Sequence, residues 1–181
     1  MSLATILRTR FTVPAATAAA AVLALTLAHP AGSAIPAGSV VGRITYNDVV
    51  GTTDLSTNLR SFAITAEVPQ GDTRVSFELP KAVHEAVSGS PDLMNAISLG
   101  RTLTSISVTL YHASTTTRFQ AWTFTNAVIV LDRQSQSGPA SATPLETVSW
   151  MFRKVRQSTY ATDGTTVVKT FCFDLQLNAA C

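Results

Sequence analysis

Apolar and polar residues alternate with a period of two along much of the chain beyond residue 60, which is typical of β-strands that bury one face. In each run the apolar residues fall on one side of the expected strand. The runs cover residues 61–68, 74–79, 105–110, 148–152 and 171–177. Because each run keeps a polar face, the pattern predicts a mainly β, antiparallel domain around one core.

The stretch 119–131 differs because it is apolar on both faces. Its apolar side chains are Phe119, Ala121, Ala127, Ile129 and Leu131 on one parity, and Trp122, Phe124, Val128 and Val130 on the other. A strand of this kind is buried on both sides, or it faces a neighbouring subunit on one of them. The alternation by itself leaves both alternatives open.

One segment has helical spacing instead. Ser90 suits the N-cap, Pro91 the first helical position, and Gly100 a left-handed stop after the last turn. The apolar stripe consists of Leu93, Met94 and Ile97. Since a helix of about nine residues is not stable alone in water, we expect this stripe to pack on the sheet and Leu93→Ala to destabilise the fold.

Turn signals separate the strands. Asp163-Gly164 predicts a hairpin turn between the last two strands, because glycine accepts a positive φ without steric cost. Residues 134–143 are rich in Ser, Gly, Ala and Pro and predict a loop between two other strands.

The N-terminal segment has the order of a secretory signal peptide. Arg8 and Arg10 precede an uncharged, mostly apolar run at 13–27, and small residues follow at 31–34. The alternative is a retained membrane anchor, but this run of about 15 residues is shorter than the roughly 20 that a spanning helix needs. We therefore predict cleavage near Ala34 and a secreted product, either extracellular or periplasmic.

This interpretation divides the chain into a signal peptide (1–34), an N-terminal lead-in with the first strand (35–60) and a β-barrel domain (61–181), with the mature protein beginning near Ile35. Removing residues 1–34 leaves 147 of the 181 residues and takes away two of the 13 Lys and Arg, so that 11 remain against 11 Asp and Glu. A balance near zero argues against nucleic acid or a membrane surface as a partner.

Few residues suggest chemistry. His84 and His112 have no partner at metal-ligand spacing, and a lone histidine is more often an ordinary surface or core residue. The sequence contains no Gly-x-Ser-x-Gly elbow and no Gly-rich phosphate loop. We therefore expect no catalytic, cofactor-binding or metal-binding residue, a chain that is not an enzyme, and little loss of stability from His84→Ala.

Two cysteines, Cys172 and Cys181, would meet an oxidising environment after export. Cys172 lies inside an expected strand and Cys181 is the last residue, so they can pair only if the tail folds back or if two chains are joined. Two unpaired thiols fit the sequence equally well, and the residues leave this open.

Aromatic residues suggest a second candidate function. Trp122, Trp150, Tyr111 and Phe124 could form a surface for stacking sugars or bases. Together with the signal peptide, such a surface would make the chain a secreted β-barrel binding module for cell-wall glycan or a protein partner. Burial in a core or at a subunit contact is the simpler explanation, and we favour it.

Three segments, in this order, resemble phrases of the Hcp family of type VI secretion tube proteins. They are SPDLMNAISLGR at 90–101, the pair ISVTLY at 106–111 and TFTNAVIV at 123–130, and PLETVSWMFRKV at 144–155; a closing FDLQLN at 173–178 is similar to the family's Trp-Asp-Leu ending, with Phe in place of Trp. The shared order, over roughly residues 62–178, makes the resemblance more specific than any single phrase.

The resemblance implies a compact two-sheet antiparallel β-barrel with one short α-helix packed on its flank. It also implies a non-catalytic structural subunit, homohexameric rings that stack into a tube, and secreted effector proteins as partners. The candidate subunit interface is then the doubly apolar strand, through Phe119, Trp122, Phe124, Val128 and Val130. Tube subunits of the family polymerise in the cytoplasm without a signal peptide, so we expect this chain to be an exported relative.

Overall fold

The computed structural model describes residues 41–50, 53–69, 74–113, 115–136 and 142–181. The predicted signal peptide, residues 1–34, and the predicted cleavage site near Ala34 lie outside the described residues.

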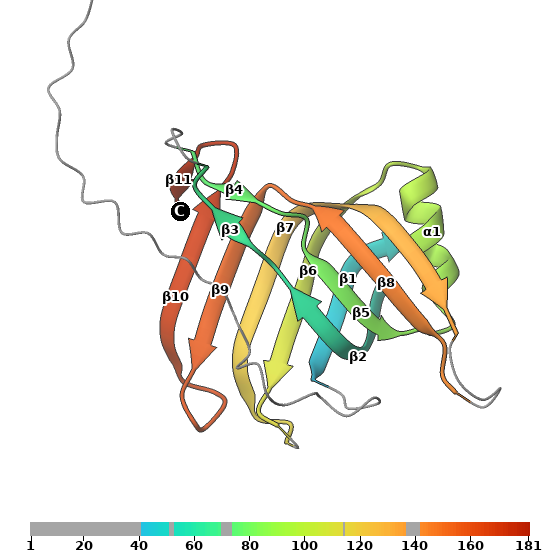
Figure 1. Cartoon of the computed structure of the whole chain (residues 1–181), viewed down its shortest axis with the longest axis horizontal. Coiled ribbons are helices and arrows are strands. Elements are labelled where there is room, and N and C mark those ends of the chain that lie inside the picture. Colours follow the sequence, from blue (N-terminus) through green and yellow to red (C-terminus); the bar gives the residue numbers. More distant parts are fainter. Residues whose placement is uncertain (1–40, 51–52, 70–73, 114, 137–141) are drawn as a thin grey trace, which may run out of the picture.

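Six strands close into an antiparallel barrel (Figure 1). In order around it they are β7 Arg118–Ser135, β6 Thr102–Tyr111, β1 Gly42–Val50, β2 Thr53–Ala63, β5 Lys81–Glu85 and β8 Leu145–Met151. Because β8 pairs again with β7, these six strands leave no unpaired edge among themselves. The predicted fold class is confirmed: a mainly β, antiparallel barrel with one short helix among the described residues.

A sheet extension continues from β7 beyond the barrel. Strand β9 (Lys154–Tyr160) pairs with the first part of β7, β10 (Val167–Asp174) pairs with β9, and β11 (Ala179–Ala180) pairs with the end of β10. This extension and helix α1 (Ser90–Ser98) lie at opposite sides of the molecule in Figure 1. The barrel and the extension therefore share one long strand, β7.

The predicted domain boundary at residue 61 is wrong. It falls inside β2, and both β1 and β2 are paired members of the barrel. The expected strand at 61–68 also divides, because the chain leaves the barrel after Ala63 and forms a separate small sheet of β3 (Ala66–Glu67) and β4 (Ser76–Phe77). The apolar alternation continues past the barrel strand because Ile64, just before this small sheet, and Phe77 within it pack against the core.

An aromatic cluster fills the barrel beside the aliphatic residues. The rings of Phe124 and Trp150 meet edge to face with centroids 5.2 Å apart, and Phe62 stacks on Trp150 at 6.4 Å. Trp122 lies parallel to Phe124 at 6.3 Å. Aromatic pairs in such offset or perpendicular arrangements stabilise a core beyond the apolar area that they bury. Large side chains therefore fix the barrel's interior, and three of them, Trp122, Phe124 and Trp150, belong to the four that the sequence suggested as a stacking surface.

Helix α1 packs against β7 and β1. Pro91 occupies the first helical turn and Gly100, with φ of 58°, ends the helix as predicted. Leu93 is fully buried and Ile97 partly buried, but Met94 is 50% exposed, so its assignment to the packing stripe is wrong; Ala96 takes that place instead. Only a narrow apolar strip of the helix, formed by Leu93, Ala96 and Ile97, therefore packs against the barrel.

The predicted hairpin between the last two strands is confirmed. Gly164 has φ of 68° in the loop between β9 and β10. The carboxylate of Asp163 accepts hydrogen bonds from the N–H groups of Thr165 at 2.8 Å and Thr166 at 2.9 Å. These bonds, together with the Thr166 hydroxyl, hold the pKa of Asp163 well below its ordinary value.

Candidate functional site

The long strand β7 changes partner halfway along its length. Residues 120–125 pair with β9 and residues 128–135 pair with β8. Between them stands Asn126, with φ of 52°, a left-handed conformation that asparagine tolerates better than most residues. Asn126 therefore marks the point where the closed barrel meets the sheet extension.

The same residue reverses which side of β7 faces the core. Before it, Trp122 and Phe124 point inward, and after it Ala127 and Ile129 do so. Even-numbered residues thus face the core before Asn126 and odd-numbered residues face it directly afterwards. This change explains why the sequence pattern predicts a strand that is apolar on both faces. The strand is not apolar on both faces along its whole length.

This reversal corrects part of the predicted interface. Trp122 is 3% exposed and Phe124 is 0% exposed, so neither can contact a neighbouring subunit. Trp150 is fully buried as well. Burial in the core, the explanation favoured from sequence, therefore accounts for three of the four residues of the suggested stacking surface, and only Tyr111, at the end of β6, is partly exposed.

The remaining predicted interface residues lie nearer the surface. Phe119 is half-buried against the ring of His112, with centroids 5.5 Å apart. Val128 is half-buried and Val130 is 37% exposed. Val128 lies directly across from Met151 of β8 in the sheet register.

These last residues belong to an exposed apolar patch. We call it the outer β7–β8 patch, and it consists of Val128, Val130, Leu131 and Met151. Leu131 is 45% exposed and Met151 52% exposed. Val128 faces Met151 across the strand pair, and a register shift between Ile129 and Leu131 accounts for the exposure of both Val130 and Leu131 beside them. Sequence reasoning found two of the four members and missed the two that the register places beside them.

A buried polar cluster lies between β5, β8 and α1, and sequence reasoning missed it. His84 and Glu146, both fully buried, are cross-strand partners in β5 and β8. The hydroxyl of Ser90 donates to Glu146 Oε2 at 2.6 Å, and Gln134 Nε2 donates to Glu146 Oε1 at 3.2 Å. Ser90 therefore does not cap the helix as predicted; it ties the first turn of α1 to the barrel.

Burial in this cluster disfavours the charged form of His84. Its Nδ1–H donates to the carbonyl oxygen of Glu85 at 2.9 Å, and Nδ1 lies 3.7 Å from Glu146 Oε2. Burial lowers the pKa of His84, although the Glu85 carbonyl and the Glu146 carboxylate act in the opposite direction. The sequence expectation that His84→Ala would cost little did not foresee this burial; because the side chain is fully buried and bonded to the Glu85 carbonyl, we now expect a clear loss of stability.

Two further groups share this environment. Burial, together with the charge of Glu146, raises the pKa of Asp132 to about 7. Burial and then the carboxylates of Glu146 and Asp132 raise the pKa of the Tyr46 hydroxyl well above its ordinary value. Tyr46 packs edge to face on His84 at 5.6 Å. Burial beside the Glu146 carboxylate thus disfavours the ionised forms of both Asp132 and Tyr46.

This arrangement does not suit catalysis. The Ser90 hydroxyl donates to a carboxylate and not to the histidine, and its side chain is buried with both partners. Among the described residues no group of three His, Cys, Asp or Glu side chains could hold a metal ion. Through the Ser90–Glu146 hydrogen bond, the cluster fixes α1 on the barrel.

No helix in the described part of the chain is long and apolar enough to cross a membrane.

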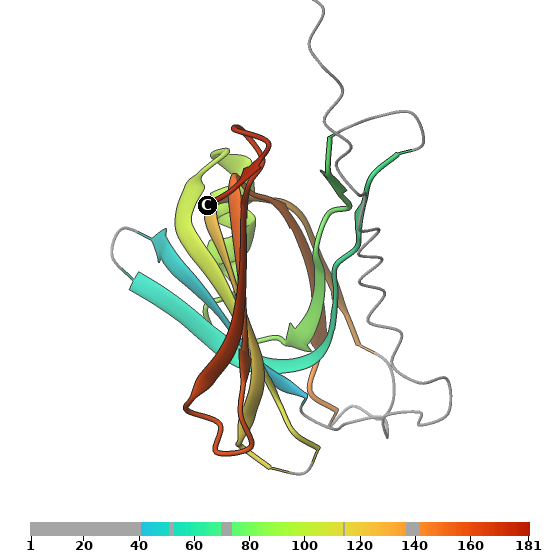
Figure 2. The same ribbon diagram turned by 90° about the vertical axis from the view of Figure 1, so that its left-hand side faces the viewer.

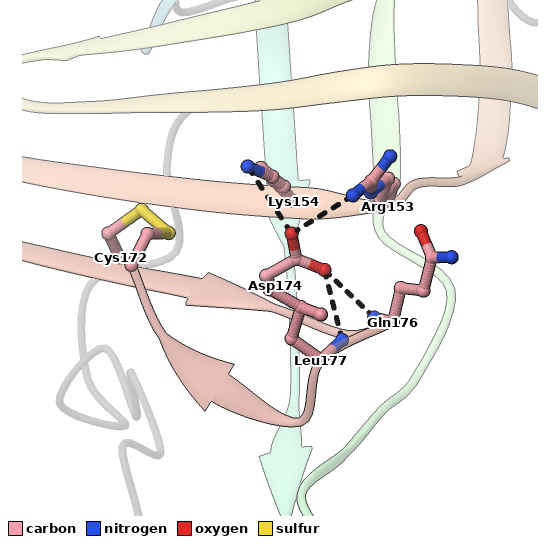
Figure 3. The surroundings of a disulfide bond; sticks show 7 residues. Arg153, Lys154, Cys172, Asp174, Gln176 and Leu177 are labelled. Carbon is pink, nitrogen blue, oxygen red and sulfur yellow. Dashed lines mark hydrogen bonds and ion pairs between the residues drawn. A yellow bond between two sulfur atoms is a disulfide. The ribbon is translucent and has the colours of Figure 1, made fainter.

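The C-terminal segment folds back on β10, and Cys172 and Cys181 form a disulfide with their Cα atoms 5.3 Å apart (Figure 3). Asp174 organises the turn, because its carboxylate accepts the N–H of Gln176 at 2.9 Å and that of Leu177 at 3.3 Å. Burial by itself would raise the pKa of Asp174, but the Leu177 N–H, Lys154, the Gln176 N–H and Arg153 hold it below its ordinary value.

Comparisons with known proteins agree with this architecture. A family profile described as "Type VI secretion system effector, Hcp" matches residues 48–159. A solved structure described as "Structure of a type six secretion system protein" is similar at 15% identity and a TM-score of 0.63, over 79% of this chain and 100% of that chain. No curated protein matches the sequence.

Two further solved structures are similar in fold. Hcp1 from Salmonella typhimurium has 16% identity and a TM-score of 0.62, over 79% of this chain and 100% of its own. A type VI secretion system effector from Yersinia pestis has 15% identity and a TM-score of 0.57, over 74% of this chain and 98% of its own. At these identities the likeness concerns the fold.

Proposed function

This chain belongs to the Hcp family of type VI secretion system effectors, and on that premise we propose that it is a non-catalytic structural subunit that assembles with copies of itself into a homohexameric ring. The resemblance of the 90–101, 106–130 and 144–155 segments to the family supports the same function. Secreted effector proteins are the proposed cargo of such rings.

The observation that carries this proposal is the outer β7–β8 patch. Val130, Leu131 and Met151 are each more than a third exposed on adjacent strands. A contiguous exposed apolar surface on a folded domain marks a site of interaction. Ring closure requires a heterologous contact, in which this patch meets a different surface of the next subunit. The half-buried Phe119, at the other end of β7, is a proposed outlying member of the contact.

Export is the second part of the proposal. The predicted signal peptide supports it, and so does the disulfide between Cys172 and Cys181, since such bonds persist in oxidising compartments and are rare in the cytosol. An exported subunit would assemble outside the cytoplasm, as an extracellular or periplasmic relative of the tube proteins.

A pair of matched variants tests the subunit contact. Val130→Asp places a carboxylate in the outer β7–β8 patch, whereas Val50→Asp makes the same change at a valine of similar exposure, 40% against 37%, at the end of β1. Burying a charge against apolar atoms costs well over the ~1.4 kcal/mol that corresponds to a tenfold loss in affinity. We expect Val130→Asp to weaken association at least about tenfold in sedimentation velocity. Equal association of both variants would rule out this patch as the interface.

A further inference from the structure

At the side of the main sheet away from the barrel, the described residues leave a strand edge largely unpaired. It is the outer edge of β10, where β11 pairs with Phe173 and Asp174, the Cys181 N–H reaches the Cys172 carbonyl, and residues 167–171 have no strand partner on that side. Figure 2 views the molecule from this side, with β10 facing the viewer. Open strand edges are templates for pairing with other chains, and proteins normally protect them. The C-terminal segment provides the partial cover here.

Little apolar burial holds that segment in place. Every residue from Gln176 to Cys181 is exposed, and Leu177 is 68% exposed. Its backbone is anchored by the Asp174 turn, by the pairing of β11 and by a single N–H of Cys181 that donates to the Cys172 carbonyl at 3.3 Å. A segment with so few buried contacts opens readily unless something covalent restrains it.

We propose that the Cys172–Cys181 disulfide is a redox-operated clip that decides whether the C-terminal segment covers the end of the β10 edge. In the oxidised protein the bond pins the segment. In the reduced protein the segment leaves β10, and the open edge lengthens from residues 167–171 to include Cys172, Phe173 and Asp174. The clip acts locally, because the closed barrel lies on the far side of β9 and shares no residue with the bonded loop.

The reductant is a small dithiol or a pair of monothiols. One thiolate attacks Cys181 Sγ, the more exposed partner, and forms a mixed disulfide while the electron pair of the broken bond leaves with Cys172 as a thiolate. The second thiol then attacks the small-molecule sulfur of the mixed disulfide and releases Cys181. In total the protein gains two electrons and two protons, and the small molecule becomes a disulfide. An oxidising compartment reverses the reaction.

The size of the expected change follows from the loop that the bond closes. The cysteines are nine positions apart, and the chain-entropy relation for a loop of that length corresponds to a factor of about 80 in an opening equilibrium. Reduction should therefore lower the exchange protection of the segment's amides by about 80-fold. The amides to follow are those of Gln176, Leu177 and Cys181, which donate the segment's hydrogen bonds.

Amide exchange measured by NMR on the full-length protein, with and without dithiothreitol, tests the clip. A double variant, Cys172→Ser with Cys181→Ser, provides the reduced state without reagent, and amides of β6 serve as the internal control. A loss of about 80-fold at the three amides in both samples, with β6 unchanged, supports the proposal. Protection that stays within threefold of the oxidised value would show that the Asp174 turn and the β11 pairing hold the segment without the disulfide, which overturns the clip.

Two other outcomes would also overturn it. If β6 loses protection together with the segment, the bond stabilises the whole barrel and is not a local device. If dithiothreitol fails to reduce the bond under native conditions, as judged by the number of thiols that an alkylating reagent labels, the bond cannot operate as a switch in the folded protein. Neither outcome depends on whether the protein forms rings.

Discussion

Replacement of Leu93 by alanine tests how the helix is held to the barrel. Leu93 is fully buried in the core, and the helix that carries it packs against β7 and β1. Removing a buried leucine side chain costs about 2–5 kcal/mol, depending on how far the surroundings collapse into the cavity. Collapse is restricted here, because the bond from Ser90 to Glu146, at 2.6 Å, fixes the first helical turn. We therefore expect a loss of about 3 kcal/mol or more.

Met94→Ala is the matched control, since it shortens the neighbouring side chain on the same helix. Met94 is 50% exposed, so truncation should cost about 1 kcal/mol or less. Thermal unfolding followed by circular dichroism would measure both. For a domain of this size, about 3 kcal/mol corresponds to a fall of roughly 6–12 °C in Tm. If Leu93→Ala lowers Tm no more than Met94→Ala does, the packing of Leu93 does not hold the helix to the barrel, and this interpretation is refuted.

Two further predictions concern the buried polar cluster and the left-handed conformation of Asn126 in β7. Burial and Glu146 raise the pKa of Asp132 from 3.8 to about 7, so the folded protein favours the protonated carboxyl. The free energy of unfolding that this preference contributes is complete below about pH 4 and is lost as the pH rises through 7. Urea midpoints should therefore favour Asp132→Asn over the wild type increasingly between pH 5 and pH 8; a constant difference would contradict the burial of this carboxyl. Asn126→Gly should leave the unfolding midpoint within about 0.5 kcal/mol of wild type, whereas Asn126→Val should cost at least about 1–2 kcal/mol, because a β-branched residue is strained at φ of 52°. Equal effects would mean that the positive φ is not required.

Features that depend on neighbours in sequence could be predicted. The helix follows from Pro91 and Gly100, which fix where it begins and ends, and the last hairpin follows from Asp163-Gly164. Both are local matters of backbone conformation. The alternating strands were predictable for a similar reason, since a half-buried sheet requires apolar residues at every second position.

Features that depend on register could not be predicted in this way. His84 and Glu146 are far apart in sequence and become partners only when β5 pairs with β8. The inward direction of Trp122 depends on the reversal at Asn126, which a simple count of parity overlooks. An asparagine in the middle of a long apolar strand was the one local signal of that reversal.

Native mass spectrometry of the purified wild-type protein over a range of concentrations would show directly whether the chain forms rings. We expect a dominant species of six protomers, with smaller species appearing on dilution as the contact through the outer β7–β8 patch dissociates. A protein that stays strictly monomeric at every concentration, while its circular dichroism shows the folded barrel, would contradict the assignment of this chain as a ring-forming subunit.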